Sequence, residues 1–125
     1  MDLQKNKENA IAFYKMTYEG KPKLALDKYV GKEYIQHNPD VADGLNVFEE
    51  YFDSMEREYP EKSIEFVRCI GEGDLVALHT HPIWPGNEEY VTMDFFRFDK
   101  KGKICDHWDA IQKIPPEPKN NNKMY

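Results

Sequence analysis

The first half of the chain carries apolar residues at steps of three and four, the spacing of one face of an α-helix. The longest such run lies between Asp2, a residue type that caps helix starts, and Gly20, a residue type that ends helices. Shorter runs predict a second helix over Pro22–Tyr29 and a third over about 43–59, ended by Pro60. The apolar faces of the first and third helices consist of Leu3, Ala10, Ile11, Phe13, Tyr14, Thr17, Tyr18, Val47, Phe48, Tyr51, Phe52 and Met55.

From Lys62 onward, apolar and polar residues alternate with the two-residue period of a β-strand that buries one face. Short turns containing Gly and Asp separate the runs, and strands joined by short turns pair antiparallel. The four predicted strands are SIEFVRCI (63–70), LVALHTH (75–81), EYVTMDFFRF (89–98) and KICDHWDAIQ (103–112).

Helices followed by an antiparallel sheet indicate an α+β fold with the helices packed on one face of the sheet. We expect three N-terminal helices on a curved, mainly antiparallel four-stranded sheet, which together make a cone with a pocket inside. Residues 1–114 form this single domain. Residues 115–125, PPEPKNNNKMY, have the composition of a flexible C-terminal tail.

Composition limits the kinds of binding partner that such a domain can have. A chain of 125 residues fits one domain, and its 40% hydrophobic residues are typical of a globular protein. A formal net charge of −6 without a basic run argues against nucleic acid and anionic membrane surfaces, and favours a small-molecule substrate or ligand. No apolar stretch could span a bilayer and the start lacks a signal-peptide core, so we expect a cytoplasmic protein. Cys69 and Cys105 have no CxxC spacing and are interpreted as ordinary thiols.

The last predicted strand carries ionisable residues among apolar ones. His107 and Asp109 share one of its faces, and a hairpin would bring Asp94 of the preceding strand beside Asp109. A histidine between two carboxylates in an aromatic wall has shifted pKa values and can serve general acid/base catalysis. The alternative is a wet sheet face on which these side chains are solvated. Asp106 and Arg97 are expected to be solvated on the other face.

A second polar group lies in YIQHNPD, residues 34–40. Because Pro39 follows Asn38, the preceding residues should be extended and the chain should turn here. His37 and Asn38 then lie on a rigid loop, where functional groups are often held. Alternatively, Asn38 makes a local turn hydrogen bond and His37 is exposed.

A metal site is the main chemical alternative to acid/base catalysis. His79 and His81 share a strand face, and Glu88 or Glu89 follows, which is similar to the His-x-His…Glu ligands of cupins. Cupins are barrels of many strands, whereas the first half of this chain is helical. We therefore favour a site without a metal or cofactor.

Taken in order, these motifs resemble the SnoaL-like polyketide cyclases, which belong with ketosteroid isomerase to the nuclear transport factor two-like superfamily. The resemblance covers about Asn9 to Gln112. It rests on YIQHNP, GLNVFEEYF, DLVALHTH and MDFFRFDKKGKICDHWDAIQ. Family members typically carry a D-x-FR strand, a turn and a GKI-x-EHWD strand, so Asp106 replaces the usual Glu. The loop HPIWPGNEE is more compact than in many relatives.

The resemblance implies a cofactor-independent enzyme, a cyclase acting by intramolecular aldol addition or an isomerase, that works next to a carbonyl. Asp109 matches the acid/base residue of the family, and His107 stands beside it. His37, Asn38 and Asp94 fall at pocket-lining positions, and His79 joins them as a candidate for substrate binding. Many family members have no demonstrated activity, so a non-catalytic ligand-binding module stays open.

The opposite face of the sheet suggests self-association. Met93, Phe95, Arg97 and Trp108 would form a patch too apolar to leave in water, and Arg97 could pair across a two-fold axis. We therefore expect a homodimer.

Overall fold

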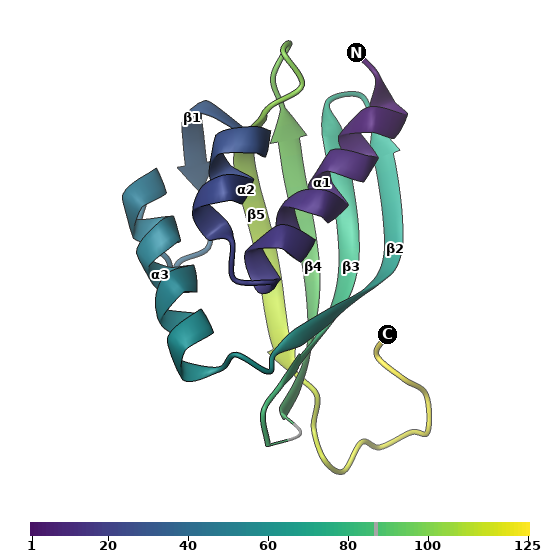
Figure 1. Ribbon diagram of the computed structural model, residues 1–125. Helices are drawn as coiled ribbons and strands as arrows, with labels where there is room; N and C mark the ends of the chain where they lie inside the picture. The colour runs from purple at the N-terminus through teal and green to yellow at the C-terminus, as the bar shows by residue number, and fades with distance from the viewer. Residues whose placement is uncertain (87) are drawn as a thin grey trace.

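The computed structural model describes residues 1–86 and 88–125, and shows three helices on one face of a curved sheet (Figure 1). The helices are α1 (Leu3–Tyr18), α2 (Pro22–Tyr29) and α3 (Leu45–Glu58). The strands are β1 (Val30–Gln36), β2 (Ser63–Glu72), β3 (Leu75–Trp84), β4 (Glu88–Phe98) and β5 (Ile104–Lys113). The predicted α+β cone is confirmed.

The starts and ends of the first two helices follow from local chemistry. The side chain of Asp2 accepts a hydrogen bond from the Lys5 backbone N–H at 3.0 Å and so caps α1. Gly20 has a φ of 82°, which glycine adopts without strain, and the chain turns there. Pro22 then opens α2, where its missing N–H is not needed.

The described part of the sheet has five strands in the order β1-β5-β4-β3-β2. From β2 to β5, each strand pairs antiparallel with the next one along the chain, as predicted, whereas β1 pairs in parallel with β5. The prediction of four strands is therefore wrong by one. In β1, VGKEYIQ, only Val30 and Tyr34 are buried, so this edge strand lacks the alternation that marked the others.

The inner face of the sheet packs on the helices and holds the core. Its fully buried side chains include Phe13 of α1 and, from the sheet, Val76, Leu78, Phe96, Phe98 and Ile104. On the outer face, the strand register places Ile70, Ala77, Phe95 and Trp108 side by side across four strands. We call this set the apolar row. Phe95 in it is 47% exposed.

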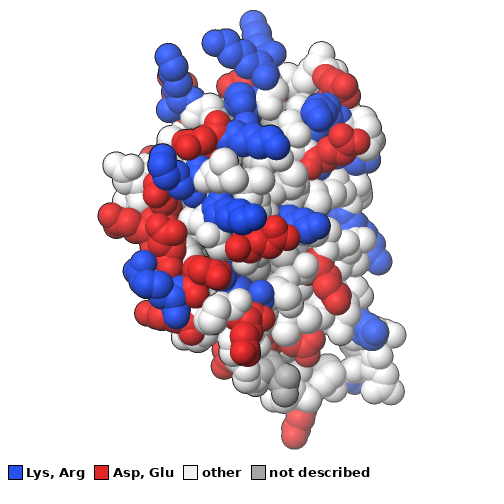
Figure 2. Space-filling view, in the orientation of Figure 1, with Lys and Arg blue, Asp and Glu red and all other residues white. Residues whose placement is uncertain are grey.

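Charge is unevenly spread over the helical side of the molecule. Acidic side chains gather over α3, and basic ones at the end that carries the β4–β5 turn (Figure 2). None of the described helices has the length and apolar character needed to cross a membrane.

The C-terminal tail, predicted to be flexible, returns to the outer face of the sheet at its end. The Met124 carbonyl lies 2.9 Å from Nε2 of His79, and the Tyr125 ring stacks on His81 with 3.6 Å between ring centroids. These two contacts cover both histidines of the His-x-His motif.

Candidate functional site

A cavity of about 480 Å³ lies between the inner sheet face and helices α1 and α3. Its aromatic lining consists of Tyr14, Tyr18, Phe48, Tyr51, Phe52, Tyr59, Trp84 and Tyr90. Polar side chains converge on one part of the wall: Gln36, Asn38, Thr80, Thr92, His107 and Asp109. An aromatic cavity with a few converging polar groups is the usual form of a small-molecule site.

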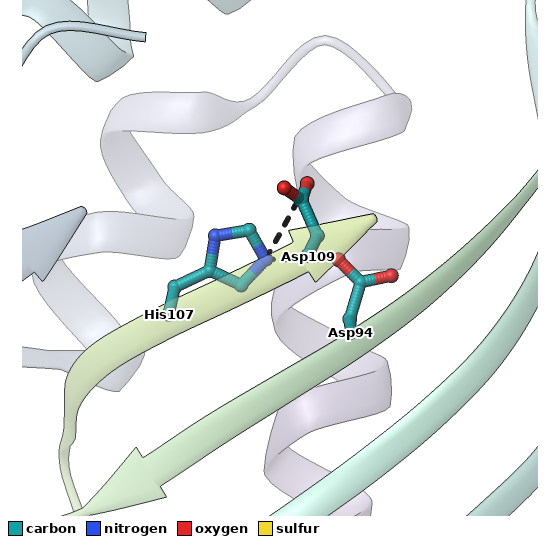
Figure 3. A group of neighbouring side chains, drawn as sticks. All are labelled: Asp94, His107 and Asp109. Carbon is teal, nitrogen blue, oxygen red and sulfur yellow. Dashed lines mark hydrogen bonds and ion pairs between the residues drawn. The ribbon is translucent and has the colours of Figure 1, made fainter. Parts of the chain in front are cut away.

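Three ionisable side chains meet beside this cavity (Figure 3). Asp94 on β4 lies directly opposite Asp109 on β5, the pairing predicted from the hairpin. Nε2 of His107 is 2.8 Å from Oδ1 of Asp94 and 3.9 Å from Oδ2 of Asp109. Asp94 and His107 are 1% and 3% exposed, so the alternative of a wet sheet face is wrong. Asp94 contacts His107 and is not itself part of the cavity wall.

Tyr14 of α1 completes this group, although the sequence placed it only on an apolar helix face. Its hydroxyl donates to Oδ1 of Asp94 at 2.6 Å and lies 2.9 Å from Nε2 of His107. The other carboxylate oxygen of Asp94 accepts from Thr92 at 2.5 Å. Because Thr92 donates its one hydroxyl proton there, Thr80 must be the donor in the 2.5 Å contact between the two threonines.

The two amide side chains at the end of β1 reach the same group. Oε1 of Gln36 lies 2.9 Å from Nδ1 of His107, and Nδ2 of Asn38 donates to Oδ2 of Asp109 at 3.1 Å. Asn38 thus lines the cavity as the resemblance implied. Gln36 was not singled out from the sequence, although YIQHNP contains it and alternation puts it on the side of Asn38.

Burial is the main cause of the raised pKa values of Asp109 and Tyr14. Desolvation, the largest cause, raises the pKa of Asp109 above its ordinary value, and Asp94 adds to this shift, whereas His107 and the Asn38 hydrogen bond oppose it. Desolvation, followed by the nearby charge of Asp94, also raises the pKa of Tyr14 well above the tyrosine value, so its hydroxyl stays a donor. A carboxyl group with a raised pKa at a cavity wall is suited to general acid/base work.

Two of the sequence candidates lie away from the cavity. His37 turns to the outer face, where Nε2 is 3.1 Å from Oδ1 of Asp106 and the ring stacks on Trp108 at 4.5 Å between centroids. His79 also lies on the outer face, with Nδ1 2.9 Å from Nη1 of Arg68. The structure does not bring either histidine to Asp109.

Asp106 was expected to be solvated, and this is wrong. It is 4% exposed and forms an ion pair with Arg97, the residue directly opposite it in the β4–β5 register. The two oxygens of Asp106 contact His37 and Arg97 respectively, so the buried charge is compensated.

Asp94, His107 and Asp109 are the described residues whose spacing could suit a metal ion, with ligand atoms within 4.8 Å of one another. In this group Oδ1 of Asp94 already accepts from Tyr14 and contacts His107, and a metal would have to displace those contacts. The Asp94 carboxylate is therefore already satisfied by protein contacts.

The metal ligands predicted from the sequence, His79 and His81, are also engaged with protein groups. His81 has Nδ1 3.1 Å from Oε2 of Glu65 and Nε2 2.8 Å from Oε1 of Glu89, and His79 contacts Arg68 and Met124. Both ring nitrogens of His81 are thus occupied. A site that works without metal or cofactor stays a prediction.

Comparison with known proteins agrees with this architecture. The family model of the SnoaL-like domain matches residues 10–107. AclR from Streptomyces galilaeus, a proposed hydroxylase, superposes with a TM-score of 0.74 at 15% identity, covering 89% of this chain and 91% of its own. IdmH from Streptomyces antibioticus, a proposed polyketide cyclase, gives 0.68 at 14% identity, covering 84% and 91%. A proposed isomerase of the SnoaL-like family from Agrobacterium tumefaciens gives 0.71 at 10% identity, covering 86% and 97%. No curated protein matches in sequence.

Proposed function

The chain belongs to the SnoaL-like domain family, and from that premise we propose that it is a cofactor-independent acid/base enzyme acting on a small carbonyl compound. The observation that carries this proposal is the position of Asp109. Its carboxylate stands at the wall of an aromatic cavity, its pKa is raised by burial, and it lies beside His107 and Asp94. Proposed cyclases and isomerases among the structural neighbours favour the same reaction class.

The chemistry needs a base and a hydrogen-bond donor on the two sides of a substrate carbonyl. Oδ1 of Asp109 has no hydrogen-bond partner among the described residues and can take the proton from the carbon next to the carbonyl. The electron pair moves to the carbonyl oxygen, and the second N–H of the Asn38 side-chain amide, which lines the cavity and gives only one N–H to Asp109, donates to this enolate. In a cyclase, the enolate carbon then attacks a second carbonyl, whose oxygen takes the proton back from Asp109. In an isomerase, the enolate regains that proton from Asp109 at another carbon.

The test is a screen of small carbonyl compounds for binding to wild type and Asp109→Asn, followed by proton-exchange assays in deuterated buffer on the compounds that bind. The Asn side chain keeps the shape and the contact with Asn38, so binding should persist while exchange falls roughly a hundredfold or more. Asp27→Asn, an exposed substitution on α2, is the matched control.

Two results would change the proposal. Turnover by Asp109→Asn at the wild-type rate would remove Asp109 from the reaction. Compounds that bind the cavity without any exchange would favour the alternative, a non-catalytic ligand-binding module.

We also propose that two copies pair through the outer face of the sheet. The apolar row and the neighbouring Met93, which is 47% exposed, supply a continuous apolar surface there. Arg97, which was expected to pair across the two-fold axis, is engaged by Asp106 of its own chain, so the apolar side chains carry this proposal.

A further inference from the structure

The end of β1 presents two side-chain amides to the two ionisable side chains of β5 that line the cavity. Gln36 is aligned with His107 in the parallel β1–β5 register, and the backbone N–H of His37 donates to the His107 carbonyl at 2.9 Å. Gln36 contacts His107, and Asn38 contacts Asp109. An amide can offer either an oxygen acceptor or an N–H donor, so its orientation decides what each partner must be.

The orientation of Gln36 is fixed by a group that can only donate. The backbone N–H of Asn38 donates to Oε1 of Gln36 at 3.1 Å, and the Nε2 end donates to the Tyr34 hydroxyl at 3.2 Å. The atom that faces Nδ1 of His107 at 2.9 Å is therefore an oxygen, and an oxygen accepts. It follows that Nδ1 of His107 carries a proton.

The orientation of the Asn38 side chain is fixed in the same way, but here the end that faces the site is the N–H donor. The backbone N–H of Asp40 donates to Oδ1 of Asn38 at 2.8 Å, which leaves the Nδ2 end facing Asp109. Oδ2 of Asp109 is thus held as an acceptor. One short segment offers an acceptor to the histidine and a donor to the carboxylate.

We propose that Gln36 and Asn38 are positioning residues that set where the protons of this site reside. Gln36 holds one proton on Nδ1 of His107, which leaves Nε2 as the ring nitrogen that faces Asp94 and Tyr14. Asn38 keeps Oδ2 of Asp109 as an acceptor and leaves Oδ1 for the substrate proton. The last step rests on the proposed function; the assignment of the His107 proton does not.

The His107 assignment is tested without substrate, by nitrogen-15 NMR of the imidazole rings across a pH titration, with the His107 signals identified by their loss in His107→Gln. In wild type, Nδ1 should be protonated at every pH sampled. Gln36→Leu removes the acceptor and should shift the ratio of the two neutral tautomers by about fivefold or more away from Nδ1–H. Gln36→Glu restores an acceptor and should keep the wild-type pattern, while Gln112→Leu, an exposed substitution on β5, should change nothing.

Two outcomes overturn the proposal: an unprotonated Nδ1 of His107 in wild type, or an unchanged tautomer ratio in Gln36→Leu. Should Gln36→Leu fail to fold, the wild-type spectra and Gln36→Glu still show whether Nδ1 of His107 carries a proton. The readout is independent of Asp109 turnover, so failure of the acid/base enzyme and failure of this assignment are separate results.

Discussion

Tyr14→Phe removes one oxygen atom from a buried polar contact. The hydroxyl donates to Oδ1 of Asp94 at 2.6 Å and lies 2.9 Å from Nε2 of His107, while the ring packs edge-on against Phe96 with 5.2 Å between centroids. Phenylalanine keeps the ring and its packing, so the change isolates the hydrogen bonds.

The magnitude follows from the charge and burial of the acceptor. A hydrogen bond to a charged group contributes about 1.5–3 kcal/mol to stability, and Asp94 would keep only its contacts with His107 and Thr92. At roughly 2.1 cal/mol/K per residue, a 125-residue chain has an unfolding entropy near 0.26 kcal/mol/K. The free energy of unfolding should therefore fall by about 1.5–3 kcal/mol and the melting temperature by roughly 6–11 °C.

Urea unfolding followed by circular dichroism measures the loss directly. Tyr51→Phe is the matched control, because Tyr51 lines the same cavity, is 44% exposed and has no hydrogen-bond partner for its hydroxyl among the described residues. It should stay within about 0.5 kcal/mol of wild type. If Tyr14→Phe were as stable as Tyr51→Phe, the Tyr14 hydroxyl would not be holding the buried carboxylate.

Three further outcomes are expected. Burial raises the pKa of Tyr14, Tyr18 and Tyr34 above the ordinary tyrosine value. Their neutral hydroxyls therefore contribute fully to the stability of the fold below about pH 10, and this contribution is lost as the pH rises further. Phenolate absorbance and circular dichroism should then change together in one steep alkaline transition. Burial also raises the pKa of Asp109, so the ionised form is disfavoured in the folded state; Asp109→Asn should unfold at higher urea than wild type at neutral pH, with the gain disappearing on acidification, and an equal gain at acid pH would contradict the shift. Phe95→Glu puts a charge in the apolar row and should convert a dimer to a monomer in sedimentation at micromolar concentration; a wild-type monomer would end the dimer proposal.

Most of the fold could be predicted because its signals are local. The three helices and strands β2 to β5 each bury one face, so their apolar residues recur in the sequence with periods of about 3.6 and 2 residues. The strand β1 has no such period, and its parallel pairing with β5 joins segments far apart in sequence. Nothing in VGKEYIQ specifies that partner.

Only the part of the site that the β4–β5 hairpin forms could be predicted from the sequence. Asp94, His107 and Asp109 meet because the β4–β5 register is set by a short turn, and the same register could have revealed the pairing of Arg97 with Asp106. Tyr14 could not be found in this way, because its partners lie 80 and 93 residues along the chain.

One error was the expectation, implied by the resemblance, that both His37 and Asn38 line the pocket. Because the strand β1 continues to Gln36, alternation sends Gln36 and Asn38 to the cavity and His37 between them to the outer face. A pattern of polar residues before a proline predicts the turn but not which of those side chains faces the inside of the sheet.

The parallel pairing of β1 with β5 also sets the order in which the site can assemble during folding. The meander from β2 to β5 closes through short turns, whereas the Gln36–His107 contact spans 71 residues and the Tyr14–His107 contact spans 93. Closing such long loops is slow, since their entropy is lost before their contacts form. A partly folded chain would therefore hold Asp94 opposite Asp109 while both lack their donors from α1 and β1, and like charges facing one another oppose this state. The docking of the N-terminal segments gives the two carboxylates their donors Tyr14 and Asn38, so the site is complete only once these long-range contacts have formed.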